Sequence, residues 1–388
     1  MRILCLTPWF PNAPGEREGN YIFDSVMALR DQGVDVKVLL VRAWKPWQRH
    51  VPNYPAFPAD LDLQMVHYPS VPRNYLQWLS NRLLFSRVYR AIVKYSRLHE
   101  VQLIHAHTEA MAEVAAAAAK ALEIRSIVTI HGINTSHRYL GTGAQKKHFK
   151  NALNACGRVV LVGEPLRTFF SNITKRDDHF RVVHNGFRIS CSSEGRQICT
   201  GLIKRLISVS NLHEGKGIDL TIRALARLKL NNINNWSYCI IGDGDKRSEL
   251  ERLVQDIGLQ EQVTFFGAVE HAEVPAHLNR ADIFVLPSYR EAFGIAYLEA
   301  MACGLLAIGV EGQGAAEFLR HEQNGLLTRG RDIDNLAITI RFALENTAAV
   351  RKMAAAGRVT ARRDFSWSNH ARVLHSVYCE LLPKRLQS

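Results

Sequence analysis

The chain has few cysteines, and none of them is placed for shared chemistry. Its 388 residues contain seven cysteines, and no two of them form a C-x-x-C pair. Structural zinc sites and redox motifs use closely spaced cysteines, and disulfide frameworks use an even number. The sequence therefore predicts reduced thiols in a cytoplasmic protein, without a thiolate metal site.

Long apolar runs are also missing. Residues 1–10 hold only a short apolar stretch that Pro8 interrupts, and no stretch of the chain approaches the length of a membrane span, which needs about 18 uncharged apolar residues. We therefore expect a first β-strand rather than a signal peptide at the N-terminus, and no transmembrane helix.

Acidic residues are scarce in the first half only. The whole chain carries 49 Lys and Arg against 36 Asp and Glu, a net charge of +13. Residues 1–190 hold 25 basic and 14 acidic side chains (+11), whereas residues 191–388 hold 24 and 22 (+2). This length suggests two domains, and the uneven charge predicts that the first one meets an anionic partner.

Short apolar runs alternate with helical patterns along the whole chain. The expected strands are 3–6, 34–41, 103–105, 126–130, 159–162, 206–209, 238–241, 263–266, 283–286 and 306–308. The expected helices are 24–32, 75–98, 111–122, 146–155, 218–230, 247–257, 274–279, 295–303, 336–344 and 366–382. Such alternation predicts α/β domains with doubly wound parallel sheets.

A break between two such domains is expected near residues 185–201. Asn185-Gly186 is a turn signal, and residues 190–194 are polar. We expect an N-terminal domain over 1–188, joined by the C-terminal helix 366–388, and a second domain over 189–365. In open α/β sheets, ligands bind beyond the carboxyl ends of the strands, so we expect the site residues there.

The most informative stretch is 286–299. An expected strand ends at Leu286, the next loop carries Glu291, and Gly294 opens a helix that carries Glu299. Carboxylates accept hydrogen bonds from neutral hydroxyls, as in a sugar or a ribose. The alternative for Glu299 is simple complementarity with the positive end of the helix dipole.

The start of that helix offers backbone donors as well. The N–H groups of Phe293, Gly294 and Ile295 lack intrahelical acceptors there, so they form a cradle for an anion. The surrounding pattern P-S-x-x-E-x-F-G-x-x-x-x-E-A-M-A-x-G runs from Pro287 to Gly304.

This pattern resembles the retaining glycosyltransferases of family four. Their hallmark is two glutamates separated by seven residues, as Glu291 and Glu299 are. Segments 208–217, 240–251, 266–275, 324–327 and 365–367 also resemble that family. The resemblance implies the GT-B fold, in which two facing Rossmann-like domains with parallel sheets enclose a deep inter-domain cleft.

The resemblance assigns roles in the second half residue by residue. Glu291 would bind hydroxyls of the transferred sugar, Glu299 the ribose, and Lys216 the donor diphosphate. Asn211 stands where the family often has an arginine, so it would donate a hydrogen bond to phosphate without adding charge. Val269 belongs to the loop that would pack on the nucleotide base.

In the first half, the resemblance singles out two positions. His131 would lie at the reaction centre beside the transferred sugar, and Gly19 matches the glycine-bearing loop that approaches the diphosphate. The alternative for His131 is a strand end closed by a hydrogen bond to the backbone. His105 and His107 flank Ala106 on one strand face, and without a third ligand they favour structural or acceptor-side roles over a metal site.

The function implied is a retaining glycosyltransferase that moves a sugar from a nucleotide-sugar donor to a lipid-linked or polysaccharide acceptor, in the biosynthesis of lipopolysaccharide, exopolysaccharide or a similar cell-surface polysaccharide. The family is thought to use a front-face route without an enzymic nucleophile. No cofactor or essential metal is expected. Asp-x-Asp pairs occur at 60/62, 243/245 and 332/334, where composition alone would produce roughly one, and the resemblance places 243/245 in a strand-turn rather than at a metal-dependent transferase site.

A basic segment at residues 73–97 indicates that the first half contacts a lipid surface. Residues 73–97 include no acidic residue and six basic ones: Arg73, Arg82, Arg87, Arg90, Lys94 and Arg97. Aromatic residues are interleaved with them, which is typical of helices that rest on anionic lipid. We expect peripheral attachment to the cytoplasmic face of the inner membrane; the alternative is a core helix with a solvated arginine face.

Three other functions are alternatives to a glycosyltransferase. A nucleic-acid-binding protein would explain the charge, but no helix-turn-helix, zinc-finger or RNA-recognition pattern is present. A Rossmann dehydrogenase would need a G-x-G-x-x-G motif after an early strand, and this chain has none. The segment Gly242-x-Gly244-x-x-Arg247 lacks the third glycine. A nucleotide-sugar epimerase or hydrolase of the same fold is the nearest alternative.

Overall fold

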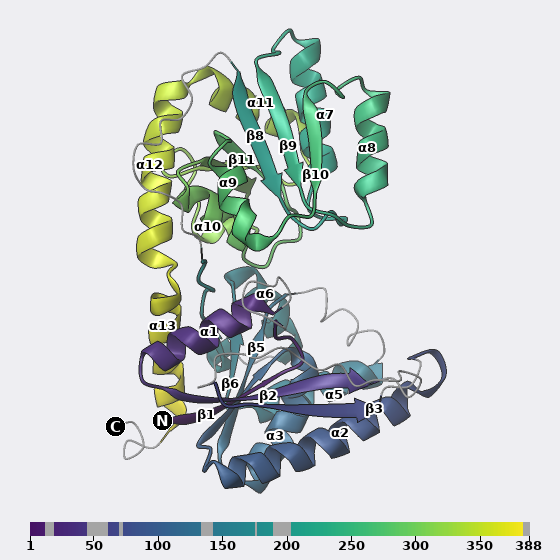
Figure 1. Cartoon of the computed structure of the whole chain (residues 1–388), viewed down its shortest axis with the longest axis vertical. Helices are drawn as coiled ribbons and strands as arrows, with labels where there is room; N and C mark the ends of the chain where they lie inside the picture. Colours follow the sequence, from purple (N-terminus) through teal and green to yellow (C-terminus); the bar gives the residue numbers. More distant parts are fainter. Residues whose placement is uncertain are drawn as a thin grey trace. The chain divides into compact units, whose positions relative to one another are not determined.

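The chain folds into two compact units, each built on its own sheet (Figure 1). The computed structural model describes residues 1–11, 19–44, 61–69, 73–132, 143–174, 177–188 and 203–382. Unit 1 comprises Met1–Gly186 and Trp367–Ser388, and unit 2 comprises Phe187–Ser366. The polar residues 190–194, where a break between domains was expected, lie outside the described residues.

Unit 1 contains a parallel sheet in the order β3-β2-β1-β4-β5-β6-β7. Its strands are β1 (Arg2–Thr7), β2 (Asp35–Trp44), β3 (Leu63–Pro69), β4 (Leu103–His107), β5 (Arg125–Ile130), β6 (Arg158–Leu161) and β7 (Phe180–Val182). Its helices are α1 (Asn20–Asp31), α2 (Arg73–Leu98), α3 (Ala112–Ala121), α5 (Gly143–Ala155), α6 (Glu164–Thr174) and α13 (Trp367–Leu381). The central strands β1, β4 and β5 are almost completely buried because helices cover both faces of the sheet.

The final helix, α13, completes the core of unit 1 although it follows unit 2 in sequence. It lies beside α1 in Figure 1, and Leu374, Val377 and Tyr378 belong to the same buried cluster as Ile3 and Val26. Helix α13 is therefore a structural part of the first unit.

Unit 2 contains a second parallel sheet in the order β10-β9-β8-β11-β12-β13. Its strands are β8 (Lys204–Val209), β9 (Trp236–Ile241), β10 (Val263–Gly267), β11 (Ile283–Val285), β12 (Leu306–Val310) and β13 (Leu326–Thr328). Its helices are α7 (Ile218–Leu230), α8 (Arg247–Asp256), α9 (Val274–Leu278), α10 (Ile295–Ala302), α11 (Ile333–Glu345) and α12 (Thr347–Asp364). The prediction of two Rossmann-like units with parallel sheets is confirmed.

Each sheet reverses its strand order at one point, and this point indicates where a ligand binds in that unit. In unit 1 the reversal lies between β1 and β4, and in unit 2 between β8 and β11. Loops that leave neighbouring strands in opposite directions there open a crevice at the carboxyl ends. Of the candidate residues, Gly19 follows β1, Asn211 and Lys216 follow β8, and Glu291 follows β11, whereas His131 follows β5 and Val269 follows β10.

One expectation about the cysteines is wrong. Cys5, Cys156, Cys239 and Cys379 are free thiols, but Cys303, which caps the C-terminus of α10, is disulfide-bonded. The scattered spacing of the cysteines gave no sign of this bond. Among the described helices, none has the length and apolar character needed to cross a membrane.

Candidate active site

The loops after β8 and β11 bring Lys216 and Glu291 together. The Lys216 ammonium donates to Oε2 of Glu291, with Nζ and Oε2 2.8 Å apart. The side chains are 26% and 12% exposed, respectively. The pair is therefore largely removed from water but still open on one side, where a charged ligand can compete for either partner.

Backbone contacts hold the two loops in register. The main-chain N–H of Tyr289 donates to the carbonyl of Gly215 over 2.9 Å, and the Ser288 hydroxyl donates to the same oxygen over 3.1 Å. Gly217 caps α7 in the left-handed region (φ 71°), and a Cβ there would lie 2.3 Å from the Pro287 carbonyl oxygen. Only glycine lets the backbone around Lys216 approach the Glu291 loop so closely.

The Glu291 loop is fixed from its other side as well. Its N–H donates to the Gln313 side chain over 3.1 Å, and its carbonyl accepts from the N–H of Gly314 over 3.0 Å. The next residues lead through Gly294, in the left-handed region, into α10. The catalytic candidate is thus held by main-chain bonds that do not use its carboxylate.

The start of α10 presents the expected backbone donors. Among the described residues, no acceptor bonds the N–H of Gly294 or Ile295. The side chain of Phe293 is buried and packs on Phe318 and Phe365, with ring centroids 5.5 and 5.9 Å apart. Phe293 therefore anchors the loop through its ring.

Glu299 does not fit the helix-dipole alternative. It is the fifth residue of α10, beyond the first turn, and its side chain is only 8% exposed. Its Oε1 lies 2.9 Å from Nε2 of His271. A buried carboxylate needs such a partner. His271 was not predicted from the sequence, because the contact joins the turn after β10 to helix α10.

The remaining donor-side candidates are Asn211 and Val269. Asn211 is exposed on the loop after β8, and its carbonyl accepts from the N–H of His213. Val269 is half-buried between β10 and the short turn that carries His271. Their expected roles stay predictions.

In unit 1, the ends of β4 and β5 carry three histidines. The rings of His105 and His107 stack with centroids 4.2 Å apart, which confirms their shared face. His107 Nδ1 lies 3.1 Å from His131 Nε2, and these rings also stack. His105 bonds the Thr129 hydroxyl and the Tyr378 hydroxyl over 2.7 and 2.8 Å, so its role is to tie α13 to the sheet.

Burial keeps these rings neutral. It lowers the pKa of His105 and of His131 to about 3, with smaller contributions from neighbouring histidines. The pKa of His107 is likewise held well below its ordinary value. His131 bonds another ring rather than the backbone, so the strand-closing alternative does not describe it.

Gly19 lies next to this cluster in unit 1. It caps α1 with φ 77°, and a Cβ there would lie 2.5 Å from the backbone nitrogen of Phe10. Tyr21, two residues on, packs its ring against His131 with centroids 4.6 Å apart. Residues 12–18 of this loop lie outside the described residues.

No metal centre is formed by the part of the chain that the structure describes. No three His, Cys, Asp or Glu residues there are grouped to hold an ion. Asp245 pairs with His213, and Asp243 pairs with Arg247, so this Asp-x-Asp pair is engaged in surface contacts.

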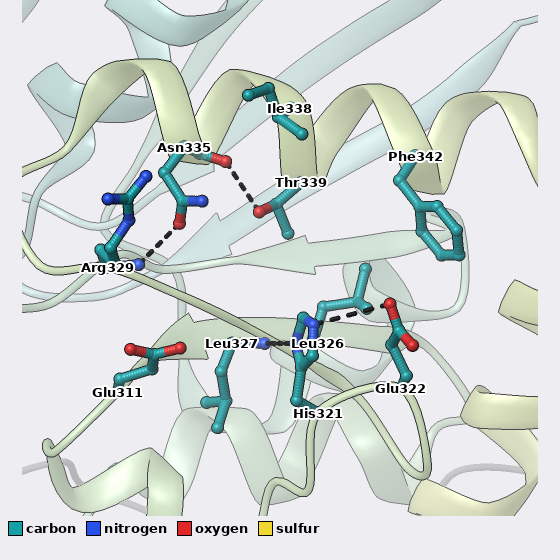
Figure 2. A pocket seen from close by; sticks show the side chains of 10 residues that line it. All are labelled: Glu311, His321, Glu322, Leu326, Leu327, Arg329, Asn335, Ile338, Thr339 and Phe342. Carbon is teal, nitrogen blue, oxygen red and sulfur yellow. Dashed lines mark hydrogen bonds and ion pairs between the residues drawn. The ribbon is translucent and has the colours of Figure 1, made fainter.

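A hollow between β13 and α11 lies apart from these residues (Figure 2). His321 Nδ1 accepts from the N–H of Leu327 over 3.0 Å, and Asn335 accepts from the N–H of Arg329 over 2.8 Å. These bonds tie β13 to its surroundings, and neither Lys216 nor Glu291 lines the hollow.

Comparison with known proteins identifies the family. Residues 203–360 match the model of glycosyl transferases group 1, and residues 19–190 match that of Glycosyltransferase Family 4. A GDP-mannose-dependent alpha-(1-6)-phosphatidylinositol monomannoside mannosyltransferase of Mycolicibacterium smegmatis is 31% identical over 169 residues, 42% of this chain and 44% of that protein. The chain spans about half the length of the curated relatives it matches.

Solved structures share the fold over almost the whole chain. Sucrose-phosphate synthase from Thermosynechococcus elongatus matches with a TM-score of 0.76 at 19% identity, covering 98% of this chain and 99% of that one. Anabaena HepE, in complex with UDP and glucose, matches with a TM-score of 0.74 at 21% identity and the same coverage. The family matches extend through both units, and the chain belongs to the group 1 glycosyl transferases, with the GT-B fold of two Rossmann-like units.

Proposed function

We propose that this protein is a retaining glycosyltransferase that uses a nucleotide-sugar donor. The observation that carries the proposal is the ion pair of Lys216 and Glu291, held 2.8 Å apart beside the start of α10. It places a cation for a diphosphate next to a carboxylate for sugar hydroxyls. Anabaena HepE, which shares the fold, binds UDP and glucose, which supports a donor of this class.

The same geometry suggests how the charge of the donor is balanced. A diphosphate beside Lys216 would also receive hydrogen bonds from the N–H groups of Gly294 and Ile295 at the positive end of α10. Glu291 would accept hydrogen bonds from the transferred sugar, and the leaving phosphate would help to deprotonate the acceptor. These donors stabilise the leaving group without a metal ion, so we propose a metal-independent reaction.

Glu291 is poorly suited to the alternative double-displacement route. That route needs a carboxylate that attacks the sugar from its far face. The Glu291 carboxylate is already engaged by Lys216, which lowers its nucleophilic character and favours binding over attack. Retention would then arise from attack on the same face that the phosphate leaves.

Donor binding is the direct test of this proposal. A panel of UDP-, GDP- and ADP-sugars should contain one that stabilises the protein in a thermal-shift measurement, because only the folded state binds it. At 100 times the Kd, the stabilisation is about 2.7 kcal/mol, which raises the Tm by roughly 5–10 °C for a unit of this size.

Product analysis then distinguishes the reaction classes. With the stabilising donor and lipid-linked sugar acceptors, NMR of the product should show that the anomeric configuration of the donor is kept. Release of free sugar or of an epimer without transfer would instead identify a hydrolase or an epimerase. Failure of every nucleotide sugar to bind would contradict the proposal itself.

For the acceptor we propose a lipid-linked or polysaccharide glycan at the cytoplasmic face of the inner membrane. The mycobacterial relative is named for a phosphatidylinositol mannoside acceptor. From residue 82 onwards, the exposed side chains of α2 are Leu98 and five cations: Arg82, Arg87, Arg90, Lys94 and Arg97. We call these five residues the α2 stripe.

The opposite side of α2 faces the core, where Val88, Ile92 and Tyr95 are buried. The helix therefore has the apolar core face that the alternative predicted. Apart from Leu98 at its end, the exposed side chains that the structure describes on this helix are all cationic. A surface of one sign suits electrostatic attachment to anionic lipid headgroups.

Neutralising part of the α2 stripe is expected to weaken membrane binding. In the triple variant Arg87→Gln/Arg90→Gln/Lys94→Gln, affinity for phosphatidylglycerol-containing vesicles should fall about 100-fold, at about 1 kcal/mol per cation. Flotation or surface plasmon resonance measures this, and 0.5 M salt should have a similar effect on the parent protein through screening.

A matched control replaces three exposed cations of unit 2. The variant Arg223→Gln/Arg252→Gln/Lys352→Gln removes the same charge from α7, α8 and α12 and should bind vesicles like the parent protein. If both triple variants lose the same affinity, net charge rather than the α2 stripe governs binding. Unchanged binding in the α2 variant would remove this surface from the proposal.

A further inference from the structure

The carboxylate of Glu299 is held at one oxygen and open at the other. Its Oε1 lies 2.9 Å from Nε2 of His271. Among the described residues, the carboxylate of Glu299 forms no other hydrogen bond or ion pair, and its Oε2 is accessible to solvent. An ionised carboxylate accepts hydrogen bonds at both oxygens. One acceptor position in a nearly buried side chain is therefore left for a ligand.

A rigid turn presents His271 to this carboxylate. His271 begins a short 3-10 turn, and Glu270 and Glu273 close it reciprocally as a capping box. In this box the N–H of Glu270 donates to the Glu273 side chain over 3.1 Å, and the Glu270 side chain accepts from the N–H of Glu273. The N–H of Glu273 also bonds the main-chain carbonyl of Glu270 over 2.9 Å. Such a box satisfies the end donors of the turn reciprocally and so stabilises it just before the following helix, α9.

His271 and Glu299 lie on segments that follow two different strands of the sheet. His271 follows β10, while Glu299 lies on α10, which follows β11. The main-chain bonds described above fix the start of α10, and the capping box fixes the turn. The His271–Glu299 bond therefore joins two independently fixed segments and sets the direction of a carboxylate that would otherwise be free to rotate.

We propose that His271 is a positioning residue, whose Nε2–H holds Oε1 of Glu299 so that Oε2 accepts a hydrogen bond from a ribose hydroxyl of the bound nucleotide. This inference rests on the proposed nucleotide-sugar function. Its consequence is specificity: the site selects ribonucleotides over deoxyribonucleotides only while His271 orients the carboxylate. A bond that merely tethers the turn to α10 would leave that selectivity unchanged.

The test measures selectivity rather than activity. Calorimetry gives the Kd of UDP, or of the nucleoside diphosphate that stabilises the protein, and of its 2′-deoxy and 3′-deoxy analogues. For the parent protein, at least one analogue should bind about 10- to 100-fold more weakly, because a hydrogen bond to a charged acceptor is lost.

Substitutions of His271 separate positioning from tethering. His271→Leu should reduce the discrimination to less than about threefold, whereas His271→Gln, whose amide N–H can reach the carboxylate, should keep most of it. His271→Asn, with a shorter polar side chain, should repeat the loss if the leucine variant does not fold. His321→Leu, a histidine of the hollow in Figure 2, is the control and should discriminate like the parent protein.

The outcomes separate this inference from the proposed function. Binding of no nucleoside diphosphate would overturn the proposed function. Binding without discrimination by the parent protein, or discrimination that survives in both His271→Leu and His271→Asn, would overturn the role of His271 alone. Loss of discrimination in His271→Gln as well would show that a donor at this position is not what orients Glu299.

Discussion

Replacing Glu291 with glutamine is expected to lower kcat for sugar transfer by about 10²- to 10³-fold, the cost of removing one charged group aimed at the reacting centre. Glutamine keeps the length of the side chain and removes its charge. The loop itself should persist, because Gln313 and Gly314 hold the main chain of residue 291 and not its carboxylate.

The same variant, Glu291→Gln, should bind the nucleoside diphosphate at least as well as the parent protein. Without the carboxylate, Lys216 loses its partner in the ligand-free protein, so its charge is more available to phosphate. The Kd of the diphosphate in Glu291→Gln should therefore be unchanged or lower. The exposed Glu311 provides the control, because Glu311→Gln removes the same charge and should transfer sugar normally. Normal transfer by Glu291→Gln would refute the assigned role.

Replacing Lys216 with methionine is expected to produce the complementary defect. Methionine fills similar space without charge, so the Kd of the nucleoside diphosphate should rise about 10- to 100-fold. The value of kcat/KM should fall by about 10²- to 10³-fold as stabilisation of the leaving phosphate is lost. Binding of the nucleoside without phosphates should not change, and Lys352→Met on α12 is the matched control.

The two substitutions should interact in stability but not in activity. Lys216→Met leaves the Glu291 carboxylate, which is 12% exposed, without its cation, at a cost of about 1–2 kcal/mol because the pair is only partly buried. Adding Glu291→Gln should restore most of this stability while transfer stays lost. If the double variant is no more stable than Lys216→Met, the ion pair contributes nothing to folding.

The sequence predicted the central elements of both sheets better than the edges. Helix α7 occupies the expected residues 218–230, because its apolar spacing is regular and a glycine precedes it. The edge strands β3, β7 and β13 were missed. Strand β3 is only partly buried and ends at Pro69, while β7 and β13 have three residues each, so neither alternation nor a long apolar run identifies them.

Two helices were missed for a different reason. Helix α12 (Thr347–Asp364) buries mostly small side chains, such as Ala354, Gly357 and Ala361. Helix α6 has only a few buried residues, including Leu166 and Phe170. A stripe of alanine and glycine carries little hydrophobic contrast, so its helical period is hard to see in the sequence.

The candidate site was predictable where its residues share one segment. Glu291, Gly294 and Glu299 lie within a single motif, so local spacing placed them on a loop and on the helix after it. The partners His271 and His107 were not predicted, because their contacts depend on how separate loops converge. For His107, the parallel register of β4 and β5 pairs it with Thr129, two residues before His131, and that register is not visible in the sequence.

The position of α13 also governs the order in which the chain acquires structure during synthesis. Unit 2 is complete in sequence at Ser366, but unit 1 lacks Leu374, Val377 and Tyr378 from its core until α13 emerges. At about 5–20 residues per second, the ribosome needs roughly 10–40 s to make residues 187–366. During that interval the nascent first unit leaves an apolar surface of α1 uncovered, and its core can be completed only after all of unit 2 has been made.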